Sequence, residues 1–401
     1  MKNEKPIKTL IQLADVSVKS PFIDRSSKTW VKFGGNNLFP NQLLELVKSS
    51  PIQSSILESL FTYSMGSGLD DWETEIYTPN LNYDWYELIK RAMKDYIYFG
   101  AFSIQATLNE DGKTYTYWHQ PVDQVRLSNY DSTNTITTAY LNADWKTATP
   151  TNTIEIKMFG AESPKLGEKY LMYFKDYNPD QLYYAIPSYY SAGNWILCDS
   201  LLSKYYANTV SNGFTPSTAI LYPNEMDNEK KEALYEMLQE NFVGVENAAN
   251  IMIFFGENGT LPDIKPLNAS NNADLYKDFS IEVMNKIISA NRLTSPTLVG
   301  LATPSGFSSK ADEMIAAYTL YKLTVVYSIR KFVLDKINYL LKLNRFPAVL
   351  NLIDFDIKSE MEGKTRENEE KQKEGLDVED EPTDEEKEDV ADEVEEENKV
   401  D

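Results

Sequence analysis

The chain has 401 residues, of which 42% are hydrophobic and 12% aromatic, with 61 acidic and 39 basic side chains and a formal net charge of -22. This composition is typical of a folded protein with one large domain or two to three ordinary ones. A single cysteine, Cys198, excludes an intramolecular disulfide framework, and together with a single histidine, His119, it excludes zinc sites of the finger or ribbon type. The charge argues against a protein that coats nucleic acid through a broad basic surface.

The negative charge is concentrated in one part of the sequence. Residues 359–401 contain 21 acidic and 6 basic side chains, a net charge of -15, which leaves a net charge of -7 for residues 1–358. The same segment has one leucine and no aromatic residue, so it cannot bury enough apolar surface to offset the entropy of ordering. We therefore expect residues 365–401 to form a disordered acidic tail.

The sequence contains no recognisable targeting signal or membrane span. Charged residues follow Met1 without the apolar segment of a signal peptide. No run of about 18 apolar residues occurs anywhere. We expect a protein that is made and used without a membrane.

The first half of the chain predicts helices followed by antiparallel strands. Apolar residues recur at helical spacing over 41–47, over 50–63 and from about 83 to Phe99-Gly100. From residue 100 to 176 the pattern alternates, with a hairpin turn at Asn109-Glu110-Asp111-Gly112. The predicted strands cover 101–106, 114–118, 124–128, 136–141, 153–158 and 168–174.

The second half predicts long helices around a small α/β unit. That unit consists of a strand over 217–222, a helix over 228–241 and a strand over 251–255. Helices over 188–213 and 272–292 flank it. A loop rich in Gly, Pro, Ser and Thr follows, and then a helix over 309–343 and a strand over 349–357. The fold class is therefore predicted to be α+β.

The candidate catalytic residues have simpler structural explanations. His119 ends a predicted strand, where a hydrogen bond at a strand edge is the ordinary role. Cys198 lies among apolar residues in the middle of a predicted helix, which is typical of a buried, inert thiol. The segment from Gly300 to Gly306 does not fit a phosphate-binding loop. Five residues instead of four separate its glycines, and Phe307 stands at the position where such a loop needs lysine. We predict no enzyme and no cofactor or metal site.

The order of the elements is more informative than these motifs. Helices this long, with one apolar stripe and no partner in the chain, are usually buried against neighbouring elements or other copies. This arrangement indicates an elongated subunit of a ring.

Several local sequences, in this order and spacing, resemble the portal protein of tailed bacteriophages and prophages over about residues 85–350. Each cue is weak by itself, and the order and spacing carry the resemblance. The cues are Phe99-Gly100-Ala101-Phe102-Ser103-Ile104, Gln120-Pro121-Val122-Asp123-Gln124-Val125, Asn212-Gly213-Phe214-Thr215-Pro216 before Ile220-Leu221-Tyr222, and Ile287-Ile288-Ser289-Ala290-Asn291-Arg292-Leu293-Thr294-Ser295-Pro296-Thr297-Leu298-Val299-Gly300.

The resemblance implies a division of the chain into the parts of a portal subunit. It departs from the family at the C-terminal side, where the acidic segment has little of the apolar periodicity of a helical crown. The implied parts are 1–187 as N-terminal and wing region, 188–213 as first stem helix, 214–271 as clip, 272–292 as second stem helix, 293–308 as tunnel loop, 309–345 as long helix, 346–364 as wing strand and short crown remnant, and 365–401 as acidic tail.

The resemblance also implies a function and partners. A portal is a homo-oligomeric ring, dodecameric in the family, at one vertex of the capsid. Genomic double-stranded DNA passes through its channel during packaging and ejection. The implied partners are the major capsid protein, the terminase large subunit and a head-tail adaptor or connector, and the implied locations are the virion and, during assembly, the host cytoplasm.

The resemblance points to candidate contact residues, although each of them also has an ordinary structural explanation. A net acidic channel with few basic residues would let DNA slide without holding it. The lysines and the arginine are equally explained by solvated helix faces or by ion pairs between subunits. The candidates are Lys286, Arg292 and Lys310 for occasional phosphate contact, Thr294, Ser305 and Ser308 for the tunnel loop, and Lys230 and Lys231 in the clip for terminase or adaptor.

Two other functions remain possible from the sequence. A soluble carbohydrate- or peptide-binding protein could use the 26 tyrosines and 6 tryptophans to line a cleft. A protein of this class would be expected to carry a secretion signal and to be a monomer. An enzyme that uses His119 is the other alternative, and a His119→Ala variant would test it.

Overall fold

The computed structural model describes residues 23–24, 29–70, 78–179, 181–211, 218–223, 252–256, 263–266, 272–301, 311–347 and 349–355. The chain divides into two units, Met1–Ile353 and Asp354–Asp401, and the first contains nearly all of the described residues. The predicted acidic tail, 365–401, lies outside the described residues.

The first helices begin where the sequence predicts them. A two-residue pairing of β1 (Ile23–Asp24) with β2 (Lys32–Phe33) precedes α1 (Phe39–Lys48) and α2 (Pro51–Met65). The Ser50 hydroxyl accepts a hydrogen bond from the Gln53 backbone N–H, and Pro51 occupies the first helical position, which needs no N–H donor. A short strand, β3 (Gly68–Asp70), follows. The sequence did not predict β1, β2 or β3, because two or three residues carry no periodicity.

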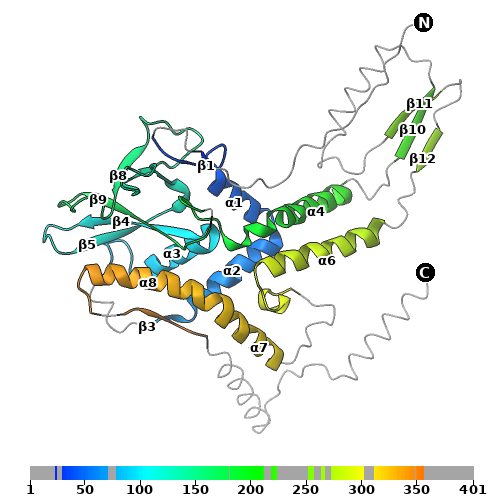
Figure 1. Ribbon diagram of the computed structural model, residues 1–401. Helices are drawn as coiled ribbons and strands as arrows, with labels where there is room; N and C mark the ends of the chain where they lie inside the picture. Colours follow the sequence, from blue (N-terminus) through cyan, green and yellow to red (C-terminus); the bar gives the residue numbers. More distant parts are fainter. Residues whose placement is uncertain are drawn as a thin grey trace, which may run out of the picture. The chain divides into compact units, whose positions relative to one another are not determined.

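The largest sheet of the described structure has six strands (Figure 1). It follows α3 (Trp85–Phe99), whose first turn is capped by the Asp84 carboxylate. The strand order is β5-β4-β9-β8-β7-β6, and every pair is antiparallel except β8 with β9. The mostly antiparallel sheet is confirmed. Its strands are β4 (Ala101–Leu108), β5 (Tyr115–Gln120), β6 (Val125–Leu127), β7 (Thr138–Leu141), β8 (Ile154–Met158) and β9 (Lys169–Lys175), with a 3-10 turn, η2 (Val122–Gln124), before β6.

The outer edge of β5 is closed by hydrogen bonds from other segments. The N–H groups of Tyr115, Tyr117 and His119 donate to the Asn344 side-chain oxygen, the Pro79 carbonyl and the Tyr83 hydroxyl, at 2.7, 2.8 and 2.7 Å. In return, the side-chain amides of Asn344 and Asn80 donate to the carbonyls of Tyr115 and Tyr117. Edge groups of this kind otherwise pair with water or with another chain.

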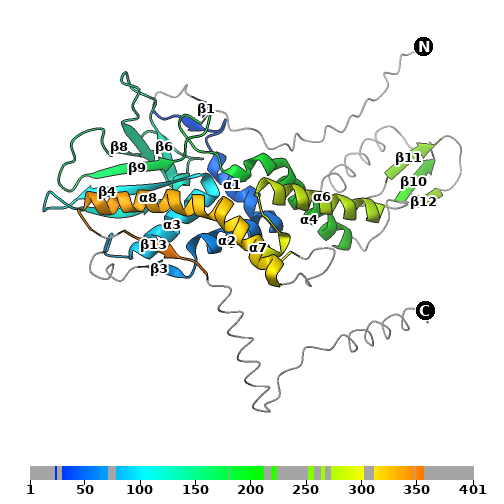
Figure 2. The same cartoon turned by 60° about the horizontal axis from the view of Figure 1, so that its bottom comes forward.

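Helices α3 and α8 (Tyr327–Leu343) pack on one face of this sheet (Figure 2). The Phe332 ring of α8 stacks on Tyr96 of α3 at 4.6 Å and meets Phe102 of β4 edge-on at 6.3 Å. The Tyr117 hydroxyl of β5 donates to the Leu340 carbonyl of α8. These contacts join α8 to α3 and the first strands of the sheet, more than 200 residues earlier in the sequence, in one core.

A buried arginine organises the part of the sheet around β6. Arg126 donates to the carbonyls of Asp123, Val125 and Asn37 and to the Asn37 side-chain oxygen. Its guanidinium lies 4.7 Å from the ring centre of Trp145. Burial lowers the pKa of Arg126 to about 10. Because carbonyl oxygens satisfy the guanidinium, it fastens α1 and the loop before it to the sheet.

Two antiparallel long helices follow the sheet in the sequence. The predicted helix over 188–213 starts as a 3-10 turn, η3 (Ser188–Ala192), and becomes α-helical in α4 (Gly193–Ser211), of 19 residues. Proline at 187 precedes this tight start. Helix α6 (Asn272–Ala290) packs against α4. A separate three-stranded sheet has the order β11-β10-β12. Its strands are β10 (Thr218–Pro223), β11 (Met252–Gly256) and β12 (Asp263–Pro266), with β10 and β11 parallel, and the predicted helix over 228–241 lies outside the described residues.

The long helix near the end of the described chain is interrupted by a π-helical turn. It consists of α7 (Ala311–Tyr321), the π turn η6 (Lys322–Val326) and α8. The prediction of one uninterrupted α-helix over 309–343 is therefore wrong at the π turn. The predicted strand over 349–357 is limited to β13 (Asn351–Ile353), which pairs with β3 and lies outside the six-stranded sheet (Figure 2).

Candidate functional site

The C-terminal end of α6 is fixed to α2 by a pair of amides. The Asn291 amide donates to the Gln53 side-chain oxygen at 2.8 Å, and the Gln53 amide donates to the Asn291 side-chain oxygen at 3.2 Å. Both side chains are buried. The Asn291 side-chain amide and backbone N–H both donate to the Ile287 carbonyl in the last turn of α6. The amide pair sets where α6 stops.

Arg292 then turns the chain away from α6. Its φ is +55°, in the left-handed region that few residues other than glycine adopt. The exposed guanidinium donates to the Thr324 carbonyl at 2.9 Å, which lies in the π turn. Turns of this kind occur frequently at functional sites. The contact links the end of α6 to the one irregular turn of the long helix.

The first residues of the predicted tunnel loop are anchored on both sides. The Thr294 hydroxyl donates to the Ala317 carbonyl of α7 at 2.7 Å. The 3-10 turn η5 (Pro296–Val299) accepts hydrogen bonds from α2, because the Tyr63 hydroxyl donates to the Leu298 carbonyl and the Ser55 hydroxyl to the Val299 carbonyl. Hydrogen bonds to α7 and α2 thus hold the base of the loop in place.

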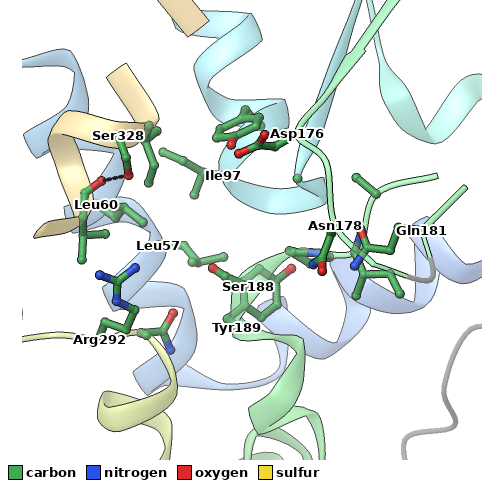
Figure 3. Close-up of a pocket in the computed structure, with 18 of the residues that line it drawn as sticks. Leu57, Leu60, Ile97, Asp176, Asn178, Gln181, Ser188, Tyr189, Arg292 and Ser328 are labelled. Carbon is green, nitrogen blue, oxygen red and sulfur yellow. Dashed lines mark hydrogen bonds between the residues drawn. The ribbon is translucent and has the colours of Figure 1, made fainter. Parts of the chain in front are cut away.

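A pocket of about 280 Å³ lies behind this region (Figure 3). Its wall combines apolar side chains of α2 and α3 with polar groups from the segment between β9 and η3 and with Arg292. Burial and the nearby Asp176 carboxylate raise the pKa of Tyr96, also in the wall, to about 12. The residues labelled in Figure 3 are Leu57, Leu60, Ile97, Asp176, Asn178, Gln181, Ser188, Tyr189, Arg292 and Ser328.

The structure places three of the predicted contact residues. Lys286 is exposed on α6, with its amino group 6.0 Å from the ring centre of Trp195 on α4. Arg292 and Thr294 lie at the loop base and are bonded to the long helix. The other predicted residues, Lys230, Lys231, Ser305, Ser308 and Lys310, lie outside the described residues.

The residues that anchor this site were not among those predicted from the sequence. Gln53, Tyr63 and Thr324 hold the end of α6 and the loop base. Their partners are between 32 and 238 positions away in the sequence. No local pattern carries such a pairing, so only the fold could identify them.

His119 and Cys198 lie in structural surroundings. The His119 ring is 2.9 Å from the Asp95 carboxylate, which also accepts a hydrogen bond from the Val122 backbone N–H. The pair thus ties α3 to the segment after β5, at the strand edge predicted for His119. Cys198 was predicted to be buried but is partly exposed on α4. The partial burial of its thiol raises the pKa of that group.

The described residues contain neither a metal-binding cluster nor a membrane-spanning helix. No group of three or more His, Cys, Asp or Glu side chains in this part of the chain could hold a metal ion. None of the helices described there combines the length and the apolarity that crossing a membrane requires.

Comparison with solved structures finds chains of similar fold in gene transfer agent (GTA) particles. A chain from the neck of the native GTA particle, computed with C12 symmetry, has 16% sequence identity and a TM-score of 0.52, over 86% of this chain and 92% of that one. A chain from the virion of the native GTA particle has 15% identity and a TM-score of 0.51, over 83% and 89%.

A further match is an HK97-family phage portal protein from Corynebacterium diphtheriae, with 10% identity and a TM-score of 0.42, over 80% of this chain and 96% of that one. No protein-family model matches the chain, and no curated protein matches it. At the level of the fold, the comparisons confirm the α+β class and the resemblance to phage portal proteins.

Proposed function

We propose that this chain is the subunit of a portal ring at one capsid vertex, through which double-stranded DNA is packaged and ejected. The observation that carries the proposal is the shared fold with a chain from a particle neck of C12 symmetry, over most of both chains. In such a ring α4 and α6 are the stem helices, and residues 214–271 are the clip. The role is a structural one, without catalysis.

The distribution of charge supports a channel role for the end of α6 and the loop after it. Although the chain has 61 acidic residues, none occurs between Glu282 and Asp312. The only charged side chains in that interval are Lys286, Arg292 and Lys310. A surface that faces a polyanion avoids carboxylates, and a few separated cations hold phosphates weakly enough for DNA to slide.

Hydrogen bonding refines the roles proposed for single residues. Arg292 uses one N–H toward Thr324, and a guanidinium has further donors for a passing phosphate. Lys286 is exposed and keeps its proposed role in phosphate contact. Thr294 is proposed to hold the loop base, because its hydroxyl already donates to Ala317. Ser305, Ser308 and Lys310 remain proposed for the loop.

The partners are proposed from the same family role. The ring would contact the major capsid protein, the terminase large subunit during packaging, and then a head-tail adaptor or connector. Lys230 and Lys231 in the clip are proposed for the terminase or adaptor contact. The protein would be found in the virion and, during assembly, in the host cytoplasm.

The alternative of a binding protein with an aromatic cleft gains nothing from the placement of the tyrosines. The most buried large side chains of the described chain include many of them, and they form the core. These are Tyr117, Tyr170, Tyr183, Tyr184, Tyr189 and Tyr321.

The proposal is tested by the mass and shape of the purified full-length protein. Light scattering and particle images are expected to show a ring of about twelve copies with a central channel, as cyclic symmetry requires. The measurement should cover a range of protein and salt concentrations, since acidic copies repel one another most at low salt. A chain that stays monomeric in every condition would contradict the proposal.

A further inference from the structure

One side of the long helix exposes an apolar seam. Ala316, Leu320, Leu323 and Tyr327 follow one another at intervals of four, three and four residues. Leu320 is 54% exposed, Leu323 65% and Tyr327 61%. Leu323 lies in the π turn and the other three side chains lie on the α-helical parts beside it, and all four are exposed. Apolar side chains at intervals of three and four residues are those with which helices pack against each other.

The other side of the same helix is already buried in the fold. Tyr321, Val326, Val333 and Ile337 are fully enclosed. A helix that is apolar on both sides is normally covered on both sides. Among the residues that the structure describes, the seam is therefore the part of this helix that stays uncovered.

The charge around the seam indicates what covers it. No acidic residue occurs from Met314 to Leu334, whereas the chain as a whole carries a net charge of -22. Two copies of so acidic a chain repel each other, and they approach best where carboxylates are missing. Lys331, four positions after Tyr327, is paired with Asp335 of the same helix at 3.1 Å, so the first carboxylate beyond this interval is already partly neutralised.

We infer that the seam of Ala316, Leu320, Leu323 and Tyr327 is a contact between neighbouring copies of this chain. The inference rests on the proposed ring, because a cyclic assembly joins two different faces of identical subunits and so needs an apolar face of this kind on each copy. The occupant is a surface of the next copy other than its own seam. A contact between two identical seams would close a dimer and stop there.

The test is the substitution Leu323→Glu in the full-length chain. The side chain is exposed, so the charge leaves the fold of the single chain intact, but it would be buried in the assembly without a partner. The concentration for half-assembly, measured by sedimentation, is expected to rise by about a hundredfold, a typical effect of an unpaired buried charge. Leu166→Glu is the matched control, because Leu166 is 61% exposed and lies beside the turn between β4 and β5, outside the seam.

Each outcome separates this inference from the proposed function. Rings formed by Leu323→Glu as readily as by the wild type would overturn the seam contact and leave the portal proposal standing. A wild-type chain that never assembles would contradict both. Thermal unfolding of the unassembled variant, unchanged from the wild type, shows that the substitution acts on assembly and not on folding.

A photo-crosslinking amino acid at position 323 supplies a second measurement. It is expected to give a ladder of products from two copies upward, because every copy donates its seam to the next one. The same amino acid at position 166 is expected to give none. Crosslinking that stops at two copies would indicate a symmetric contact and would overturn the inference.

Discussion

The amide pair of Asn291 and Gln53 shows how single residues position the candidate site. Each amide is both donor and acceptor to the other, so that neither is left unsatisfied in the buried interface of α2 and α6. The pair lies directly before Arg292. A shift of the pair would therefore move Arg292, one of the residues proposed to face DNA.

Replacing one member of the pair should destabilise the fold. Asn291→Ala leaves the Gln53 amide buried without its partner and is expected to cost about 1–3 kcal/mol, measured as the free energy of unfolding in denaturant. Asn285→Ala, on the exposed side of the same helix, is the control and is expected to change it by less than about 0.5 kcal/mol. If a double variant with leucine at both 53 and 291 were as unstable as Asn291→Ala, the unsatisfied amide would not be the cause.

At the scale of elements, the sequence predicts what is regular and local. The helices over 41–63 and the strands between 101 and 174 follow from the spacing of their own apolar residues, and the structure contains them. The π turn in the long helix was not predictable, because one extra residue per turn barely changes the pattern of Tyr318, Tyr321 and Val325. The pairing of β3 with β13 joins three residues to three others about 280 positions away, which no local pattern can indicate.

Gly66 is the point at which this remote pairing constrains a residue type. Its φ is +61°, and a Cβ there would lie 2.0 Å from the Ile353 carbonyl oxygen and 2.6 Å from the Arg330 guanidinium. That guanidinium donates to the Ser64 and Tyr63 carbonyls and so holds the end of α2. Position 66 therefore requires glycine for two reasons: its positive φ and the close approach of the Ile353 carbonyl oxygen.

Gly66→Ala is expected to detach β13 from β3 and to lower the melting temperature by more than Gly300→Ala. Gly300 has a similar φ of +74° but no atom within 4 Å of an added Cβ, so its substitution costs only the strain of the left-handed conformation, about 1–2 kcal/mol. Hydrogen exchange at the Leu352 amide reports the pairing directly. Equal melting temperatures for the two variants would show that the close approach at Gly66 has no energetic consequence.

At the scale of the whole molecule, the acidic residues are unevenly distributed along the chain. The acidic excess lies mainly in residues 359–401, and carboxylates are missing from Val283 to Ala311 and again from Met314 to Leu334. The first of these intervals carries the residues proposed to face DNA, and the second carries the proposed contact between copies. A net charge of -22 thus conceals two stretches of the sequence that contain no acidic residue.

Removal of residues 359–401 should strengthen weak binding to double-stranded DNA. The remaining chain has a net charge of -7, so that it repels phosphates less. Anisotropy of a labelled duplex is expected to show tighter binding at about 50 mM salt and no difference at about 1 M, where the Debye length is about 3 Å. A full-length variant with the acidic side chains of this segment changed to glutamine or asparagine is the matched control. It should behave like the truncated chain, and wild-type behaviour would show that the charge of the segment is irrelevant.

The closed edge of β5 has a consequence for the proposed ring, which would bring many copies of the chain together in one place. Exposed strand edges are the usual starting points of fibrous aggregates, because any extended segment can add to them. Here Pro79, Tyr83 and Asn344 occupy the positions that an intruding strand would take. Crowded subunits are thereby steered away from open-ended cross-β growth and toward contacts through side chains, which can end in a closed particle of defined size.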